Sequence, residues 1–434
     1  MITLYGTDGA TVTLYGTDGT PVSGGGGGGG GEDTTGWVTP RHVTTNSTWW
    51  RMSEAASEAG SVIVVRHDVR IPGKALRARW GQFPAASTMI HKNLTYKGRA
   101  SLVIDGTPYR LTFGGAPSVT IGYGESVLSD PLPDSVTVQP GSIVHSVWEA
   151  EPGSMLITGG VGSSAGAASY RASGTWDGTV PTMTSTGLSG SPTQIIGDTP
   201  DTRPAQSVLI LGDSFVEAGW ARGGAEANGL AWSDMGLWLE PTATTRAQIE
   251  NRIGATGDVP FDVIVTAFGG NNSTQSLAEQ QAVHIESWRM IATLGASDIA
   301  AMTLHPYTDS TDRWATVEGQ THRVIAANSD GETTREPSRT ARNDWIRDGA
   351  PLSITTWDPY PTGTTDPAAV RAGEPGHPLT LPAFDQADAC ETARNSGIWK
   401  VDGGAWTVDG AHLTGHGSAM LQTYYETWVQ ANLT

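Results

Sequence analysis

The sequence has little cysteine and little positive charge. Its single cysteine, Cys390, stands among 434 residues, so no intrachain disulfide and no cysteine-rich metal site can form. We therefore expect packing to provide the stability. Lys and Arg number 26 against 44 Asp and Glu, which gives a formal net charge of −18. Because phosphate backbones and anionic membranes are bound through clustered Lys and Arg, this charge disfavours nucleic acid as a partner.

Long apolar runs are also missing. No window of the sequence approaches the length of a membrane span, and Met1–Gly6 has neither the basic start nor the apolar core of a signal peptide. We expect no membrane span and no classical signal. Phe is scarce, with 6 residues against 16 Trp. Trp rings stack well on sugars, although we expect most of them to be core residues.

Residues 1–31 have a composition of their own. The stretch Ile2–Gly9 returns almost unchanged at Val12–Gly19, and each copy has the pattern of a short strand followed by an Asp-Gly turn. Eight consecutive glycines follow at Gly24–Gly31, a composition typical of a flexible linker. We predict a repeat hairpin segment that pairs with another chain or between subunits, then a linker.

Residues 32–200 have an all-β pattern. Short runs rich in β-branched residues alternate with Gly and Pro turns, and the clearest runs are 61–66, 75–80, 101–105, 109–113 and 135–139. Short strands at this spacing predict a sandwich or jelly roll. The Gly, Ser and Thr-rich stretch 159–201 connects this region to the next one. Its residues 168–173 are assigned to the same β-domain.

Residues 201–434 change to apolar strands that alternate with helical stretches. Strands are predicted at 207–212, 261–268 and 298–304, and amphipathic helices at 276–291 and 420–433. This alternation is typical of an α/β domain with a parallel sheet. The polar, Pro-rich residues 330–397 are predicted to form long loops around one end of the sheet.

Two motifs in this region indicate nucleophilic catalysis. Gly212-Asp213-Ser214 follows a buried strand directly, which places the Ser214 hydroxyl at the carboxyl edge of the sheet, where open α/β sheets bind ligands. A helix-capping serine is the structural alternative. Asp409 and His412 near the C-terminus are three residues apart, so the carboxylate can orient the imidazole that takes the serine proton.

A third motif supplies a candidate for the oxyanion hole. Gly269-Gly270-Asn271-Asn272 follows the predicted strand 261–268 at the same edge of the sheet. The Asn271 amide could donate to the oxyanion that forms when Ser214 attacks an ester. An asparagine in a left-handed turn is the structural alternative.

The order of these three motifs resembles the SGNH (GDSL-like) hydrolase family. That resemblance implies a three-layer α/β/α catalytic domain, Ser214 as nucleophile and Asp409 with His412 as its partners. It also implies an oxyanion hole made of the Ser214 N–H, Asn271 and a second-block glycine. We assign that glycine to Gly257, while the alternatives Gly229, Gly236 and Gly254 stay open. The family usually has Asp where Asn272 stands, and it needs no metal or cofactor.

Two further stretches extend the resemblance. Residues 112–131 and Arg342–Arg347 look like those of actinobacterial SGNH hydrolases that carry a β-sandwich before the catalytic domain. The N-terminal repeat and glycine run look similar to the starts of tail proteins from phages of actinobacteria. The implied function is a serine esterase acting on O-acetyl or other acyl groups of a cell-envelope polysaccharide or glycolipid.

The implied location is a virion or the extracellular space, with other tail proteins and further copies of the chain as partners. The rival interpretation is a host-recognition module that binds carbohydrate on the same scaffold. A secreted lipase is a third, disfavoured by the lack of a signal peptide.

Three other patterns are set aside. Gly162–Gly166 fits a Gly-x-Ser-x-Gly nucleophile motif but lacks the strand and helix around it. His305 ends a predicted strand and could line the pocket or pack in the core. His416 stands four residues after His412, but no further metal ligands cluster nearby.

Overall fold

The computed structural model describes residues 36–47, 52–55, 60–81, 95–122, 125–160, 169–183, 188–189, 192–216, 219–237, 250, 253–254, 257–271 and 275–434. Trp37–Thr434 belongs to one compact unit. The predicted hairpin repeat and linker at 1–31 lie outside the described residues, and so does the Gly162–Gly166 pattern.

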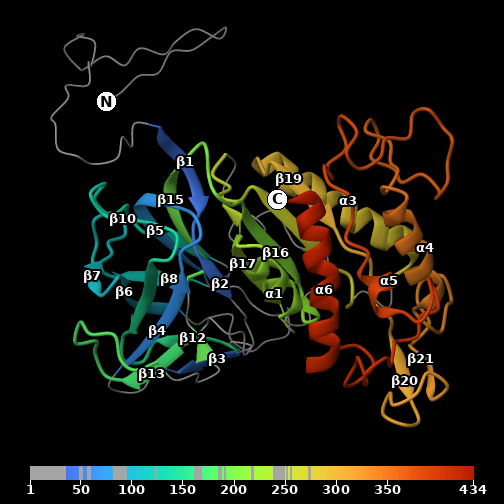
Figure 1. The fold of residues 1–434 in the computed structure, drawn as a ribbon, viewed down its shortest axis with the longest axis horizontal. Helices are drawn as coiled ribbons and strands as arrows, with labels where there is room; N and C mark the ends of the chain where they lie inside the picture. Colours follow the sequence, from blue (N-terminus) through green and yellow to red (C-terminus); the bar gives the residue numbers. More distant parts are fainter. Residues whose placement is uncertain are drawn as a thin grey trace, which may run out of the picture. The chain divides into compact units, whose positions relative to one another are not determined.

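Five strands form a parallel sheet with the order β19-β18-β16-β17-β2 (Figure 1). Every neighbouring pair in it is parallel. The strands are β2 (Thr45–Ser47), β16 (Ser207–Asp213), β17 (Ala231–Leu237), β18 (Val263–Ala267) and β19 (Asp298–Ala301). The strands predicted at 207–212, 261–268 and 298–304 are confirmed, the last of them shorter than expected.

Strand β16 is buried on both faces. Val208 and Ile210 belong to one hydrophobic cluster, and Leu209 and Leu211 to another. The first cluster includes residues of α1 and α6, and the second includes residues of α3 and α4. Successive side chains of a strand point to opposite faces, so a continuous apolar run is what a sheet covered on both sides requires.

The helices among the described residues are α1 (Trp220–Ala227), α3 (Leu277–Leu294), α4 (Glu336–Arg347), α5 (Gln386–Cys390) and α6 (Gly415–Asn432). The helices predicted at 276–291 and 420–433 are confirmed. Ser276 and Glu279 form a capping box at the start of α3. The prediction of loops throughout 330–397 is wrong at α4 and α5. Helix α4 is not predicted from the sequence because its buried side includes arginines, and a search for periodic apolar residues does not detect them.

Apart from β2, the described strands that precede β16 form antiparallel sheets. One has the order β1-β15-β5-β10 with β9 beside β5, and another the order β13-β4-β11-β6-β7 with β8 beside β6. A smaller sheet has the order β14-β12-β3, and the antiparallel pair β20-β21 lies in the C-terminal half. The bounds are β1 (Trp37–His42), β3 (Met52–Ala55), β4 (Ser61–Asp68), β5 (Gly73–Gly81), β6 (Tyr96–Ile104), β7 (Thr107–Arg110), β8 (Val119–Ile121), β9 (Ser126–Leu128), β10 (Thr137–Val138), β11 (Ile143–Ala150), β12 (Met155–Gly160), β13 (Ser169–Ser173), β14 (Leu188–Ser189), β15 (Gln194–Pro200), β20 (Thr308–Ser310) and β21 (Gln320–His322).

The two larger antiparallel sheets share one core. Leu76 and Ile195 of the first sheet belong to the same cluster as Ile63 and Leu102 of the second. The predicted placement of 168–173 is confirmed, because β13 pairs with β4. At least eight of the sixteen Trp side chains are fully buried, which fits the expectation that packing is their main use. The structure thus has the expected mixture of a helix-flanked sheet and antiparallel sheets.

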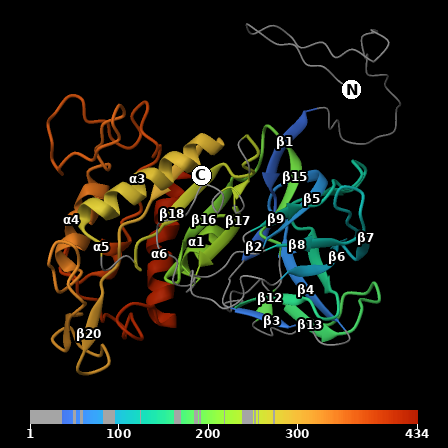
Figure 2. The same cartoon turned by 180° about the vertical axis from the view of Figure 1, so that it is seen from behind.

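Contacts join residues of the first half to the parallel sheet. Strand β2 pairs with β17. Arg41 of β1 lies 2.7 Å from the carboxylate of Asp262, the residue that immediately precedes β18. Arg203 contacts the same carboxylate. The boundary at residue 200 stays a prediction, although β2 shows that the early chain contributes to the parallel sheet (Figure 2).

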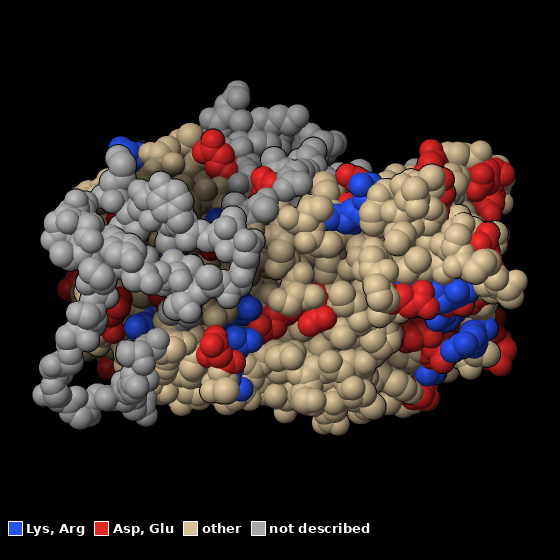
Figure 3. Space-filling view, turned by 90° about the horizontal axis from the view of Figure 1, so that it is seen from above, with Lys and Arg blue, Asp and Glu red and all other residues tan. Residues whose placement is uncertain are grey.

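Charged side chains of both signs mix on the surface. On the face drawn in Figure 3, Lys and Arg lie beside Asp and Glu. Within the part of the chain that the structure describes, no helix has the length and apolar character needed to cross a membrane.

Candidate active site

Ser214 lies immediately after β16, at the carboxyl edge of the parallel sheet. The turn that carries it is held by Asp213, whose Oδ1 accepts a hydrogen bond of 3.0 Å from the Phe215 N–H. Phe215 and Trp220 are buried beneath the turn, and the Trp220 indole donates to the Phe215 carbonyl oxygen. The backbone after the strand is therefore anchored on both sides of Ser214.

His412 and Asp409 reach Ser214 in one hydrogen-bonded series. The Ser214 hydroxyl oxygen lies 2.9 Å from His412 Nε2, and His412 Nδ1 lies 2.7 Å from Asp409 Oδ2. An ionised carboxylate can accept a hydrogen bond but cannot donate one, so the Nδ1 atom that faces Asp409 must carry the proton. Nε2 is then free of a proton and accepts the hydrogen bond of the serine hydroxyl. The structure brings together the three residues predicted for the triad, across 198 positions of sequence between Ser214 and His412.

A tight turn holds the acid and the base. The other oxygen of the Asp409 carboxylate accepts from the N–H groups of Ala411 and His412, at 2.9 and 2.7 Å. The Thr407 hydroxyl donates to the His412 carbonyl oxygen and accepts from the Gly410 N–H. The imidazole is thus oriented by backbone as well as by the carboxylate.

The Asp409 carboxyl stays ionised in this setting. Partial burial raises its pKa, but the hydrogen bonds from the His412 side chain, the His412 N–H and the Ala411 N–H outweigh burial and lower the pKa below the ordinary value. A negative charge beside Nδ1 stabilises the imidazolium that would form when His412 takes the serine proton.

Asn271 lies in the loop that follows β18, close to the Ser214 turn. The N–H of the preceding Gly270 donates a 3.0 Å hydrogen bond to Asp213 Oδ2. One buried carboxylate therefore ties the loop of Asn271 to the turn of Ser214. Burial raises the pKa of Asp213, against the lowering effect of the bonds from Phe215 and Gly270. Asn272 lies outside the described residues.

The assignment of Gly257 to the oxyanion hole is wrong. Its N–H donates to the carbonyl oxygen of Leu294, the last residue of α3. Helix α3 returns from the carboxyl end of β18 to the start of β19, so Leu294 lies at the edge of the sheet opposite Ser214. The N–H of Gly257 is engaged there and cannot reach the nucleophile.

Among the alternatives, position favours Gly236. It lies near the carboxyl end of β17, in register with Gly212 of β16. Gly229 precedes β17, and Gly254 lies beside Asp258 before β18, so both are at the opposite edge. Residues 238–249, which follow β17, lie outside the described residues.

The two further histidines have structural contacts. The His305 ring stacks on Phe215 with centroids 3.8 Å apart, and burial lowers its pKa well below the ordinary value, so it is neutral. The His416 Nε2 lies 2.8 Å from the Asp402 carbonyl oxygen. Across the described ranges, no group of three or more His, Cys, Asp or Glu is arranged to hold a metal ion.

Arg323 is a site residue that sequence reasoning missed. Its guanidinium donates to the Asp409 carbonyl oxygen and to the Thr308 carbonyl oxygen, the latter at 3.0 Å, and it pairs with Asp309 at 2.8 Å. It therefore braces the turn that carries the acid. Arg323 stands 86 positions before Asp409, and no local motif marks it.

Comparison with protein-family models and with curated proteins gives no match. Among solved structures, a putative platelet activating factor from Streptococcus pneumonia is 12% identical over 52% of this chain and 84% of that one, with a TM-score of 0.32. A carbohydrate acetylesterase from Sinorhizobium meliloti is 15% identical over 52% of this chain and 99% of that one, at 0.30.

The catalytic domain of a peptidoglycan O-acetyltransferase from Streptococcus pneumoniae is 12% identical over 52% of this chain and 94% of that one, with a TM-score of 0.25. The similar structures thus include an acetylesterase and an acetyltransferase. Their TM-scores are all below 0.5, so the chemistry of this chain has to be inferred from its own residues.

Proposed function

We propose that this chain is a serine esterase of the SGNH type, in which Ser214 is the nucleophile, His412 the general base and Asp409 the orienting acid. The observation that carries the proposal is the continuous hydrogen-bonded series from the Ser214 hydroxyl through the His412 imidazole to the Asp409 carboxylate. In this proposal the parallel sheet with its helices is the three-layer catalytic domain, and the antiparallel sheets form a sandwich or jelly roll.

The reaction is acyl transfer in two steps. His412 Nε2 takes the proton of the Ser214 hydroxyl as its oxygen attacks the ester carbonyl, and the imidazolium then gives that proton to the leaving alcohol. Asn271 and backbone N–H groups stabilise the oxyanion. Water, deprotonated by the same imidazole, then attacks the acyl-enzyme, and the proton returns to Ser214 as the carboxylic acid leaves.

The substrate class proposed is an O-acetyl or other acyl ester of a cell-envelope polysaccharide or glycolipid, and the setting a virion or the extracellular space. Support comes from the Trp-rich composition and from the repeat and glycine run at 1–31. The substrate test is acetate release from isolated actinobacterial cell walls. Hydrolysis of small soluble esters without any release from walls would contradict the substrate class and leave the esterase intact.

Hydrolysis of p-nitrophenyl acetate and butyrate tests the esterase itself. We expect Ser214→Ala and His412→Gln to reduce kcat by about 10⁴-fold or more, because the nucleophile and its base act as one unit. The matched control is His416→Gln, four residues further on and bonded to Asp402, which should keep wild-type activity. Equal rates in wild type and Ser214→Ala would instead favour the carbohydrate-binding, host-recognition module.

A further inference from the structure

Helix α4 presents a row of arginines to the active-site end of the sheet. Arg335, Arg339 and Arg342 are spaced by four and three residues, so they lie on one side of the helix. Arg339 and Arg342 are buried, and Arg335 is half-buried. Burying three guanidinium groups on one helix is costly unless their N–H groups find acceptors.

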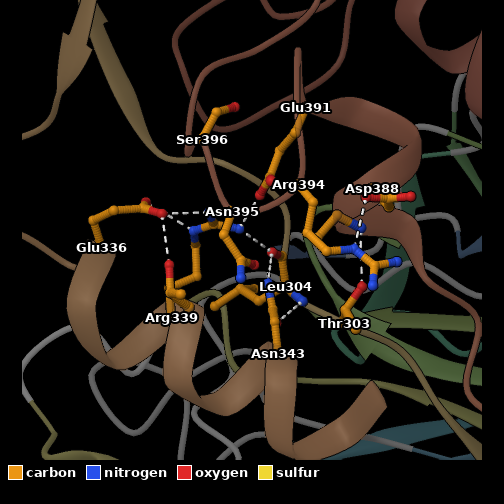
Figure 4. Close-up of polar contacts among 12 residues, drawn as sticks. Thr303, Leu304, Glu336, Arg339, Asn343, Asp388, Glu391, Arg394, Asn395 and Ser396 are labelled. Atoms are coloured by element: carbon orange, nitrogen blue, oxygen red, sulfur yellow. Dashed lines mark hydrogen bonds and ion pairs between the residues drawn. The ribbon is translucent and has the colours of Figure 1, made fainter. Parts of the chain in front are cut away.

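Each member of the row donates to a backbone carbonyl beyond the end of a parallel strand. Arg342 Nη2 donates to the Phe268 oxygen at 2.8 Å, and Arg335 donates to the Gly270 oxygen. Arg339 Nη1 donates to the Leu304 oxygen at 2.9 Å, beside Asn343, which bonds both the N–H and the carbonyl of Leu304 (Figure 4). Helix α4 therefore holds the chain that leaves β18 and the chain that leaves β19.

The three arginines differ in how their charge is balanced. Arg339 pairs with the carboxylates of Glu336 and Glu391 (Figure 4). Among the described residues, neither Arg335 nor Arg342 forms a salt bridge, and the buried Asp213 carboxylate is a negative charge that attracts both of them. Burial lowers the pKa of Arg342 to about 10, which leaves it protonated at neutral pH. The Arg335 guanidinium lies over the Tyr307 ring, 3.6 Å from its centroid.

The loop between β18 and Asn271 is consequently fixed at three backbone polar groups. Arg342 holds the Phe268 carbonyl, Asp213 holds the Gly270 N–H, and Arg335 holds the Gly270 carbonyl. The Gly270 carbonyl belongs to the same peptide group as the Asn271 N–H. A hydrogen bond to that carbonyl therefore fixes the orientation of the peptide that leads into Asn271, whose side-chain amide is the proposed oxyanion donor.

We propose that Arg335 and Arg342 are positioning residues of the oxyanion hole, which place Asn271 by holding the carbonyl groups of Gly270 and Phe268. This inference rests on the proposed esterase function. It assigns to Arg339, whose charge is balanced, a purely structural role at β19.

The test uses the full chain, p-nitrophenyl acetate and a trifluoromethyl ketone that forms an oxyanionic adduct with the active serine. We expect Arg335→Gln to lower kcat by about 10- to 100-fold, with KM changed by less than about twofold, because the interaction is made in the transition state. The inhibition constant for the ketone should rise by the same factor. Arg335→Lys keeps the charge and should recover part of the loss.

The matched control is Arg347→Gln on the same helix, whose side chain bonds Asp385, Asp344 and Asn395 away from the loop. It should leave kcat and ketone binding unchanged. Thermal unfolding identifies variants that fail to fold, which matters most for the buried Arg342, where Arg342→Lys is the variant to use.

Wild-type kcat in a folded Arg335→Gln, or an equal loss in Arg347→Gln, would overturn the positioning role while Ser214-dependent hydrolysis stands. A wild type that hydrolyses no ester would remove the proposed function, and this inference with it.

Discussion

Gly270 leaves no space for a side chain beside the nucleophile turn. A Cβ atom built on it would lie 2.7 Å from Asp213 Oδ2, the same oxygen that accepts the Gly270 N–H. Gly270→Ala must therefore displace either the carboxylate or the loop of Asn271. Because a displacement of about 1 Å can cost about 10²-fold in rate, we expect kcat for p-nitrophenyl acetate to fall by that order.

Gly415→Ala is the control for this substitution. Gly415 is the first residue of α6, and a Cβ atom there meets no atom within 4 Å. That variant should keep full activity and gain up to about 1 kcal/mol from helix propensity. An active Gly270→Ala would mean that the tie between Asp213 and Gly270 is dispensable.

At the scale of elements, the β20-β21 hairpin supports the turn of Asp409. The Thr308 N–H at the start of β20 donates to the Gly410 carbonyl oxygen at 3.1 Å, and Arg323 follows β21 directly. Gly410 adopts φ +83°, and a Cβ atom there would overlap the Thr308 carbonyl oxygen, so only glycine allows this approach. The hairpin and the acid turn are thus packed backbone to backbone.

Arg323→Ala removes the side-chain hydrogen bonds to the Thr308 and Asp409 carbonyl oxygens and leaves the backbone contacts in place. We expect kcat to fall by about tenfold, because the Asp409 carboxylate becomes less well oriented toward His412. Arg313→Ala, at an exposed position in the same hairpin, should leave kcat unchanged. Steady-state kinetics of both variants, with circular dichroism to verify folding, measures the difference. Equal kcat values for the two would show that backbone contacts suffice to hold Asp409.

For the whole molecule, buried neutral histidines predict loss of stability in acid. Burial lowers the pKa of His42 from 6.5 to about 4 and that of His67 from 6.5 to about 3. His42 Nδ1 accepts from the Ile195 N–H while Nε2 donates to the Trp232 carbonyl oxygen, so a second ring proton would face another N–H. His42 thereby links β15 to β17.

The direction in which stability changes with pH follows from how many protons the folded and unfolded chains bind. Below pH 6.5 the unfolded chain binds protons at these histidines that the folded chain does not, so stability is highest above pH 6.5 and decreases as the pH falls toward 4. Each histidine contributes a slope of up to about 1.4 kcal/mol per pH unit. Urea unfolding between pH 8 and pH 4.5 should show a smaller slope for His42→Gln than for wild type, and equal slopes would contradict this origin of the acid sensitivity.

Local signals predicted much of the fold. The strand at 207–212 was recognisable because burial on both faces requires an uninterrupted apolar run. Helix α4 was missed because arginines whose N–H groups bond carbonyls of other segments occupy its buried side. Such a helix lacks the apolar stripe on which prediction depends.

The parts of the site that are local or joined to a strand end could be predicted from the sequence. Asp409 meets His412 within one turn, and Ser214 and Asn271 follow strands whose carboxyl ends share an edge of the sheet. Three features emerge from the folded chain alone: Gly257 lies at the opposite edge of the sheet, β2 joins the parallel sheet, and α4 holds the loop of Asn271. These depend on which distant segments become neighbours, and spacing along the chain does not contain that information.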